Sequence, residues 1–265
     1  MEYLYETHLH TNQASACGKS RGREYISRYK DLGYTGIIVT DHFYRGCSAL
    51  SQSLPWPKWV DAFCRGYEDA REEGERRGLD VFFGWEETYD GDDYLVYGLD
   101  KDWLLQHPEV RRWTRKEQFD QARRCGGCVV HAHPFRQYYY LSGIRLYGCV
   151  DAVEAANGGN QRSFDALAWA YAKKIGVPVL AGTDIHRVDD AYHDSTFGVY
   201  LDKKMENITD YVKAVKNNNI SGLKVPEGRF DICGNERVLL PVDIRDNMER
   251  KIKKNIFEFL ELTSN

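Results

Sequence analysis

The sequence predicts an α/β fold in which mostly parallel strands form a closed or nearly closed barrel with helices outside it. Short apolar runs alternate with longer amphipathic segments along most of the 265 residues, which indicates strand–helix repeats. Runs such as Ile37-Ile38-Val39 are continuously apolar, as in strands that are buried on both faces. Six or seven such units favour a barrel, although an open doubly wound sheet would give almost the same pattern.

Seven apolar runs are the expected strands. They lie at residues 3–7, 36–40, 81–85, 94–99, 128–132, 151–155 and 177–182. Four helices are expected between them, at residues 23–33, 57–78, 114–127 and 160–176. All four segments end in glycine, at Gly33, Gly78, Gly127 and Gly176, a common signal for a helix C-terminus. Thr114 and Glu117 have the spacing of a capping box, which marks a helix start.

The C-terminal part departs from the alternation. Residues 243–262 have the pattern of an amphipathic helix, with Ile252, Ile256, Phe257 and Leu260 on one side. We therefore expect one barrel domain over residues 1–265, with residues 243–263 as a C-terminal helical extension that packs across the barrel or on a partner subunit. Residues 230–243 receive no assignment, and the pattern predicts no oligomeric state.

Composition restricts the location and the partners. No apolar run approaches the roughly 20 residues that a membrane span needs, and the N-terminus lacks the pattern of a signal peptide. The seven cysteines are then expected as free thiols in the cytoplasm. A net charge of −4 argues against a large surface for duplex nucleic acid without excluding nucleic acid. It leaves room for a small phosphorylated substrate.

Residues that bind metals gather at the ends of the expected strands. The side chains in question are His8, His10, Asp41, His42, Glu86, Glu87, His133, Asn157, Asp184 and His186. Alternate residues of a strand face the same way, so His8 and His10 project together. The C-terminal ends of parallel barrel strands open on one face, so the whole set is expected to converge there. Five of the eight histidines belong to it, whereas His131 lies inside a strand.

Such a donor set indicates a multinuclear metal site. Imidazole nitrogen together with carboxylate oxygen suits zinc, manganese or iron. The set exceeds the four ligands of one tetrahedral zinc ion. Two or three divalent ions with bridging carboxylates are therefore expected, and such sites clamp the oxygens of a phosphoryl group.

Five motifs resemble those of the PHP (polymerase and histidinol phosphatase) family. They are HLHT, VTDH, GWE, AHPFR and GTDIH, in this order, within residues 3–200. The resemblance implies a distorted (β/α)7 TIM-like barrel, a metal site at the C-terminal ends of the strands and phosphoester hydrolysis. It implies metal ligands at His8, His10, Asp41, His42, Glu86, His133, Asp184 and His186. Glu87 and His131 are set aside as neighbours of ligands.

Two positions depart from the family pattern. Many members carry a further ligand histidine or aspartate shortly after the first motif, where this chain offers Cys17 as a possible thiolate ligand. Many members also carry a histidine after the glutamate strand. Here Asp92 or Asp93 stands at that place, and Asp93 is preferred because it adjoins the strand.

The resulting hypothesis is a metal-dependent phosphoesterase that acts on a small phosphorylated substrate. A metal-bound hydroxide would attack phosphorus at a di- or trinuclear site. Arg136 would bind the phosphate as a bidentate donor, with Lys19, Arg21 and Arg187 as weaker alternatives. Asp184 or His42 would protonate the leaving group.

Two other functions are compatible with the same residues. An amidohydrolase-type enzyme would use a similar barrel and ligand set, although no lysine that could form a carbamate bridge follows the ligand-bearing strands. A non-catalytic metal-binding PHP module would be favoured by lost ligands, whereas most are present. Neither the substrate nor the identity of the metals follows from the sequence.

Overall fold

The chain is organised around one large sheet. The computed structural model describes residues 2–137, 143–232, 237–246, 250–252 and 256–261. The strands of the sheet are β1 (Tyr3–Leu9), β2 (Gly36–Val39), β3 (Asp80–Tyr89), β4 (Asp92–Tyr97), β5 (Cys128–Ala132), β7 (Ala152–Asn157), β8 (Val179–Gly182), β9 (Gly198–Leu201) and β10 (Gly222–Lys224). Their order in space is β10-β9-β1-β2-β3-β4-β5-β7-β8. All seven predicted runs are therefore strands.

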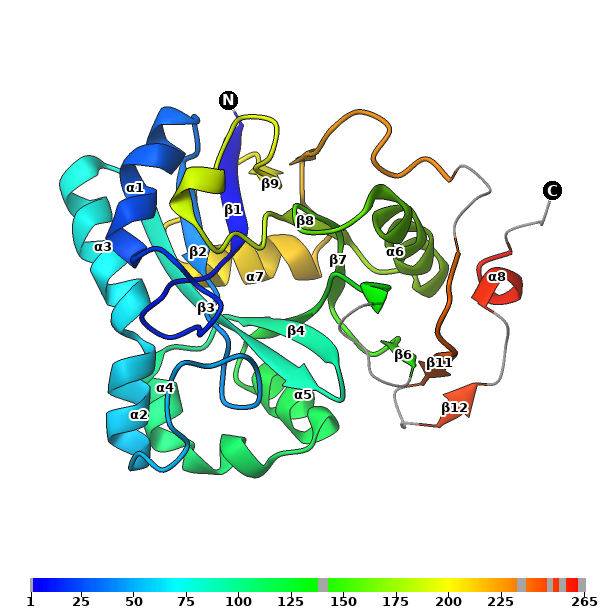
Figure 1. The fold of residues 1–265 in the computed structure, drawn as a ribbon, viewed down its shortest axis with the longest axis horizontal. Coiled ribbons are helices and arrows are strands. Elements are labelled where there is room, and N and C mark those ends of the chain that lie inside the picture. Colours follow the sequence, from blue (N-terminus) through cyan, green and yellow to red (C-terminus); the bar gives the residue numbers. More distant parts are fainter. Residues whose placement is uncertain (1, 138–142, 233–236, 247–249, 253–255, 262–265) are drawn as a thin grey trace.

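The strands from β1 to β8 curve into a nearly closed barrel. In the described chain, seven of them (β1, β2, β3, β4, β5, β7 and β8) form its wall, and β8 returns to β1 (Figure 1). Leu9 and Ile185 form a parallel bridge at this seam. The amide of Asp184 donates to the carbonyl of His8 at 2.9 Å, and the amide of His10 donates to the carbonyl of Ile185 at 2.9 Å. This arrangement confirms the TIM-like barrel.

The barrel is distorted by one reversed strand. β4 pairs antiparallel with both β3 and β5, so the run predicted at residues 94–99 is a strand of opposite direction. A tight hairpin connects β3 to β4, and Asp90 (φ 57°) and Gly91 (φ 92°) take left-handed conformations in it, as hairpin turns require. The beginning of β4 therefore lies at the barrel end where the parallel strands finish.

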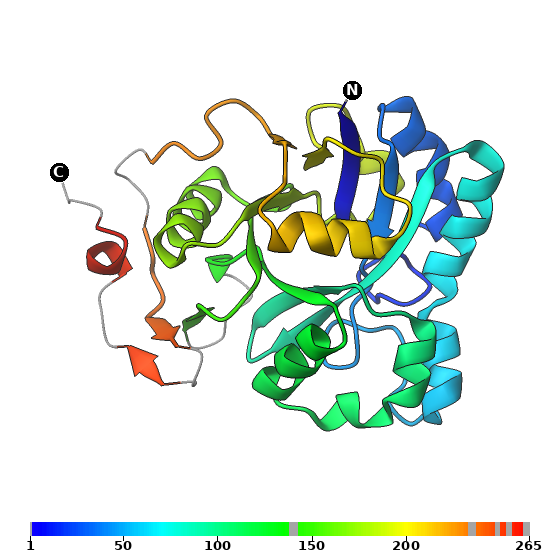
Figure 2. The ribbon, with the colours of Figure 1, turned by 180° about the vertical axis from the view of Figure 1, so that it is seen from behind.

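Helices surround the sheet (Figures 1 and 2). The α-helices are α1 (Gly22–Asp31), α2 (Trp56–Phe63), α3 (Arg65–Arg77), α4 (Lys101–Gln106), α5 (Arg115–Arg124), α6 (Arg162–Ile175), α7 (Ile208–Lys216) and α8 (Ile256–Phe259), and the 3-10 turns are η1 (Pro108–Arg112) and η3 (Val188–Asp190). The helix predicted at 57–78 is interrupted at Cys64. Thr114 caps α5 as predicted, because its side chain accepts from the amide of Glu117.

An apolar layer fills the barrel interior below the strand ends that carry the histidines. Its buried side chains come from successive strands and include Tyr5, Ile38, Leu95, Val130 and Leu180. Helix α7, the gold helix of Figure 2, adds Tyr211, Val212 and Val215 to this layer. Among the described helices, none combines the length and apolar character that crossing a membrane requires.

A small second sheet replaces the predicted C-terminal helix. It contains β6 (Ile144–Tyr147), β11 (Val242–Arg245) and β12 (Lys251–Ile252), in the order β12-β11-β6. The expectation of one helix over residues 243–262 is wrong, because β11 pairs in parallel with β6 and the only described helical turn there is α8. Val242-Asp243-Ile244-Arg245 alternates with period two, and β6 offers an edge with which it pairs. Residues 247–249, 253–255 and 262–265 of the predicted helix lie outside the described residues.

Candidate metal centre

Imidazoles and carboxylates converge at the barrel end where the parallel strands finish. Three groups of side chains place their donor atoms within 4.8 Å of one another, namely His8/Glu86/His133, His8/His10/Asp184 and His10/His42/His186. His8 and His10 are shared between groups, so the three groups form one continuous cluster. The sequence-predicted ligands His8, His10, His42, Glu86, His133, Asp184 and His186 are thus brought together.

His8 lies at the centre of the cluster. Its Nδ1 is 3.0 Å from Oε1 of Glu154 on β7, and its Nε2 is 3.0 Å from Nε2 of His10. The same Nε2 is 3.4 Å from Glu86 and 3.5 Å from Asp184. A carboxylate on Nδ1 fixes the proton there and directs the lone pair of Nε2 into the cluster, as in carboxylate–histidine–metal arrangements.

Glu86, on β3, lies between two imidazoles. Its Oε1 lies 3.0 Å from Nε2 of His133, and its Oε2 lies 2.9 Å from Nδ1 of His42. Its neighbour Glu87 faces the other way, where its carboxylate is paired with Arg45 at 2.8 Å. The alternation of β3 therefore separates the two glutamates as predicted.

Two members of the cluster adopt left-handed backbone conformations. His133 follows β5 with φ 31°, and Asp184 follows β8 with φ 57°. Residues other than glycine rarely occupy this region, and such strain is concentrated at functional sites. At this seam, the hydrogen bond of the Asp184 amide to the His8 carbonyl holds its backbone in place.

The carboxylates of the cluster are ionised. Burial raises the pKa values of Glu86 and Asp184, but the charges of protonated His42 and His8, together with further neighbours, hold both pKa values well below normal. Burial, reinforced by His42, lowers the pKa of His10 to about 3. His10 is therefore neutral and offers lone pairs beside ionised carboxylates. Neutral imidazoles and carboxylates are the states in which these side chains bind metals.

Two buried atoms indicate that an ion fits the cluster. Oε2 of Glu86 and Nδ1 of His42 are 2.9 Å apart, close enough for an ion pair when His42 is protonated, but they lack the geometry of a hydrogen bond. Buried polar atoms without hydrogen bonds are rare in folded proteins. Since both atoms point into a group of nitrogen and oxygen donors, the residues present fit divalent metal ions.

Cys17 lies beside the outermost imidazoles. The rings of His42 and His186 stack on either side of His10 at centroid distances of 4.4 and 4.6 Å. Burial raises the pKa of the Cys17 thiol, but hydrogen bonds with His186 and His42 lower it to about 6. The thiolate expected from the sequence is thus favoured next to two candidate ligands.

Asp41, which was predicted as a ligand, instead accepts hydrogen bonds from the loop after β1. Its Oδ1 accepts from the amide of Thr11 at 2.6 Å and from the hydroxyl of Ser15 at 2.6 Å, while its Oδ2 accepts from the hydroxyl of Thr11 at 2.7 Å. Ser15 in turn lies 3.2 Å from Nδ1 of His10. Asp41 therefore supports His10 through Ser15 and belongs to none of the three donor groups.

Asp93 lies at the rim of the cluster. Its Oδ2 is 3.9 Å from Nε2 of His133, and its Oδ1 accepts from the hydroxyl of Thr88 at 2.5 Å. Burial, together with the charge of Glu86, raises its pKa to about 8. Asp92, the alternative, pairs with Arg115 at 3.1 Å on the far face of β4. The preference for Asp93 over Asp92 agrees with this geometry.

Arg136 reaches the cluster through Asp184. Its Nη1 donates to Oδ2 of Asp184 at 2.6 Å and its Nε donates to Oδ1 of Asn160 at 2.6 Å, while its Nη2 donates to Asn157. Arg21, a weaker alternative, instead pairs with Asp69. Arg136 is buried and rigidly held, with its charge next to the carboxylate of Asp184.

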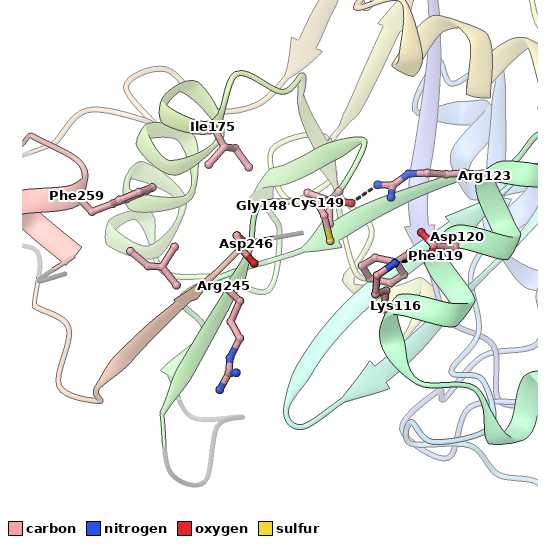
Figure 3. A pocket seen from close by; sticks show the side chains of 12 residues that line it. Lys116, Phe119, Asp120, Arg123, Gly148, Cys149, Ile175, Arg245, Asp246 and Phe259 are labelled. Atoms are coloured by element: carbon pink, nitrogen blue, oxygen red, sulfur yellow. Dashed lines mark hydrogen bonds and ion pairs between the residues drawn. The ribbon is translucent and has the colours of Figure 1, made fainter. Parts of the chain in front are cut away.

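A cavity of about 320 Å³ opens above the cluster. It is lined by Cys17, His42, Arg45, Gly46, Cys47, Glu86, Thr88, Gly91, Asp93, His133, Arg136, Asp184 and His186. Lys19 and Arg187 are not among these described lining residues. A larger cavity of about 590 Å³ lies between α5, the end of β11 and α8 (Figure 3). No histidine is among its twelve described lining residues, so the metal-ligand chemistry belongs to the smaller cavity.

Several supporting residues were missed from the sequence. Glu154 contacts His8, Ser15 contacts both His10 and Asp41, and Arg229 holds Asp165 near Asn157. A carboxylate within the apolar run at 151–155 was a usable signal for Glu154, because a buried glutamate requires a partner. Nothing local in the sequence marks Ser15 or Arg229.

Comparison with known proteins supports the fold. No family model and no curated protein match the sequence. A two-domain protein from Bacteroides vulgatus, described as containing a predicted PHP-like metal-dependent phosphoesterase, matches with a TM-score of 0.63 and 16% identity over 83% of this chain. This chain spans only 64% of that protein. The likeness shows that the chain has the fold of a PHP-like metal-dependent phosphoesterase.

Two further structures match less closely. One is a candidate metal-dependent phosphoesterase from Bifidobacterium adolescentis, with 17% identity, a TM-score of 0.46 and coverage of 80% of this chain and 94% of that one. The other is an amidohydrolase from Chromobacterium violaceum, with 14% identity, a TM-score of 0.45 and coverage of 79% and 96%. These two likenesses are too weak to decide between the two activities.

Proposed function

We propose that this chain, which has a PHP-like fold, is a metal-dependent phosphoesterase that hydrolyses a small phosphorylated substrate. The observation that carries the proposal is the position of Glu86, whose two oxygens face His133 and His42 at 3.0 and 2.9 Å. A carboxylate between imidazoles is the arrangement of a bridging ligand in a multinuclear site. The cavity of about 320 Å³ above it suits a small substrate.

Two or three divalent ions, drawn from zinc, manganese and iron, would be held by the clustered side chains. The ligands would be His8, His10, His42, Glu86, His133, Asp184 and His186, with Cys17 and Asp93 at the edge. Ions bound there supply a water-derived nucleophile near neutral pH and neutralise charge on the phosphoryl oxygens. Zinc suits the Cys17 end of the cluster best, since thiolate is a soft ligand.

Arg136 and His42 would act directly on the substrate. Arg136 lines the cavity and is held by Asn157, Asn160 and Asp184, so its charge is already positioned for phosphoryl oxygens. His42 also lines the cavity, whereas Asp184 is occupied by Arg136. If His42 is not a metal ligand, it is the better placed of the two to give a proton to the leaving group.

The experiment is a hydrolysis assay of the purified chain loaded in turn with Zn²⁺, Mn²⁺ or Fe²⁺. Phosphomonoesters, phosphodiesters and, for the amidohydrolase alternative, N-acyl amides are the substrates. We expect phosphoester turnover that His10→Ala abolishes and that His193→Ala, a change at an exposed histidine, leaves intact. Turnover no higher than that of His10→Ala would contradict the proposal, and hydrolysis of amides alone would replace it with the alternative.

A further inference from the structure

Two cysteines from different loops lie next to each other at the wall of the metal cavity. Cys17 follows β1 and Cys47 follows β2, and both line the cavity. Ser15 and Ser48 form an antiparallel bridge, and the amide of Ala16 donates to the carbonyl of Cys47 at 2.8 Å. The two loops therefore run side by side at the separation of paired strands, roughly 5 Å, and Cys47 lies opposite Ala16, the residue before Cys17. Disulfides join Cα atoms that are usually about 4.4–6.8 Å apart.

The two thiols also share one cavity wall. Cys17 and Cys47 line the same cavity as His42 and His186, and the amide next to Cys17 is bonded to the Cys47 carbonyl. Both cysteines are free, and Cys47 is exposed. An accessible thiol with a second thiol beside it is the arrangement of redox-sensitive cysteine pairs. Neither thiol is needed for the barrel, because both lie in loops above it.

We propose that Cys17 and Cys47 form a dithiol that hydroperoxides oxidise to a disulfide. The modification joins the loop after β1 to the loop after β2, across the mouth of the cavity. In the reduced chain, Cys17 offers its sulfur as a ligand beside His42 and His186. The disulfide removes this ligand.

The oxidation proceeds in two balanced steps. The sulfur of Cys17 attacks a peroxide oxygen, so that an S–O bond forms, the O–O bond breaks, and hydroxide or alkoxide leaves. The sulfur of Cys47 then attacks the sulfenic acid of Cys17. An S–S bond forms, and the hydroxyl group leaves as water with the proton of the Cys47 thiol. The two thiols together lose two electrons, which reduce one peroxide.

The effect on metal binding rests on the proposed function, whereas the oxidation does not. Cys17 bound to a metal ion is protected, because its lone pair is already donated. Cys17 in a disulfide no longer binds the ion. Metal and peroxide are thus expected to compete for the same sulfur.

The experiment maps the disulfide by mass spectrometry. The full chain is freed of metal with a chelator, treated with hydrogen peroxide, blocked with N-ethylmaleimide and digested with trypsin. Cys17 falls in peptide 1–19 and Cys47 in peptide 46–58, each with a single cysteine. We expect these two peptides to appear linked in most of the protein, at a mass lower than their sum by two hydrogen atoms.

Variants identify the role of each thiol. In Cys47→Ser, a change at an exposed position, we expect Cys17 to remain as a sulfenic acid that dimedone captures. In Cys17→Ser, no linked pair should form. The matched control is Cys125→Ser, another exposed cysteine, which should give the same linked pair as the unaltered chain.

Zinc tests the second half of the proposal. Loading with Zn²⁺ before peroxide should reduce the yield of linked peptides by at least fivefold, and the oxidised chain should bind fewer zinc ions than the reduced chain. Failure to form the linked pair under conditions that oxidise Cys125 would overturn the dithiol. Equal yields with and without zinc would overturn the competition with metal. Both readouts are peptide masses and zinc content, so absence of phosphoester turnover would refute only the proposed function.

Discussion

Single residues behind the cluster determine how its ligands are presented. Glu154 lies on β7 and is fully buried, with its carboxylate 3.0 and 3.2 Å from Nδ1 of His8. It also accepts from the side-chain amide of Asn157 at 2.8 Å. Such a partner fixes the ring orientation and makes the opposite nitrogen a stronger ligand. Glu154 is thus a positioning residue, because it acts on the metal through His8.

Replacing this carboxylate should weaken metal binding. For Glu154→Gln we expect a loss of about 10- to 100-fold in affinity for Zn²⁺ or Mn²⁺, measured by competition with a chromogenic chelator. The control is Glu87→Gln, because Glu87 is equally buried and lies beside Glu86 but faces Arg45. Equal metal affinities in the two variants would show that Glu154 does not orient His8.

Asp165 gives the stability a pH dependence. Its carboxylate accepts from Nε of Arg229 at 2.7 Å and from the side chain of Asn160 at 2.8 Å. Burial nevertheless outweighs Arg229 and raises the pKa of Asp165 to about 6. Between the ordinary pKa of 3.8 and about 6, the folded chain keeps a proton that the unfolded chain has lost. The contribution of Asp165 to the free energy of unfolding therefore falls as pH rises through this window.

The comparison of Asp165→Asn with the unaltered chain isolates this effect. From pH 4 to pH 6.5 the unaltered chain should lose on the order of 2 kcal/mol relative to the variant, as measured by urea unfolding. Asp189→Asn, at an exposed position, should follow the unaltered chain throughout. Parallel pH profiles for Asp165→Asn and the unaltered chain would be the contrary result.

The residues that could be predicted are those that end a strand. His8, Glu86, His133 and Asp184 follow apolar runs, and the parallel fold brings such ends together whatever the loops do. Asp41 also ends a run, yet Thr11 and Ser15 capture its carboxylate. This choice depends on the conformation of the loop at residues 11–18, which no periodicity encodes.

At the scale of elements, helix α3 packs directly against residues that support the metal cluster. A Cβ on Gly66, in α3, would lie 2.1 Å from Oγ1 of Thr11 and 2.8 Å from Oδ2 of Asp41. The helix thus presses its backbone against the Thr11–Asp41 pair that supports Ser15 and His10. Only glycine leaves room for this contact.

Gly66→Ala should therefore destabilise the fold. Alanine in a helix normally gains up to about 1 kcal/mol over glycine, but the overlap with Thr11 and Asp41 should cost about 1–3 kcal/mol, so we expect a net loss in urea unfolding. The control is Gly148→Ala, where the nearest atom, the carbonyl oxygen of Arg245, is 3.8 Å away. A variant at Gly66 as stable as the unaltered chain would disprove this packing argument.

The sequence predicted whether a segment is a helix or a strand where the apolar pattern was long. It did not predict whether a strand runs parallel or antiparallel to its neighbours. The run at 94–99 looks the same whether the strand is parallel or reversed, since apolar content does not encode direction. The segment after residue 242 shows helical spacing at Ile252, Ile256 and Leu260 but strand spacing at Val242 and Ile244. Residues 242–245 form a strand because they pair with the edge of β6. That edge exists only in the folded chain.

At the scale of the whole molecule, the cluster joins distant parts of the barrel. His8 belongs to β1, Glu86 to β3, His133 follows β5 and Asp184 follows β8. The Leu9–Ile185 seam closes the wall beside them. An ion bound to such a set contacts the folded chain only, so it stabilises that state in proportion to its concentration.

Added metal should therefore raise the melting temperature. At a concentration one hundred times the dissociation constant, the gain is about 2.7 kcal/mol, which corresponds to roughly 5–10 °C for a chain of this size. Differential scanning fluorimetry with Zn²⁺ or Mn²⁺, reversed by a chelator, measures the shift. His133→Ala should remove it, whereas His193→Ala should retain it, and an unchanged melting temperature in the unaltered chain would speak against a metal centre.

The reversal of β4 gives the protein a natural attachment point. Asp90 and Gly91 form a hairpin tip that joins two strands already bonded to each other along their length. Extra residues placed at such a tip displace neither partner. Gly91 borders the cavity, so a short inserted peptide that carries a fluorophore would lie at the cavity entrance. Its fluorescence would report ligand binding, and the barrel would keep its geometry.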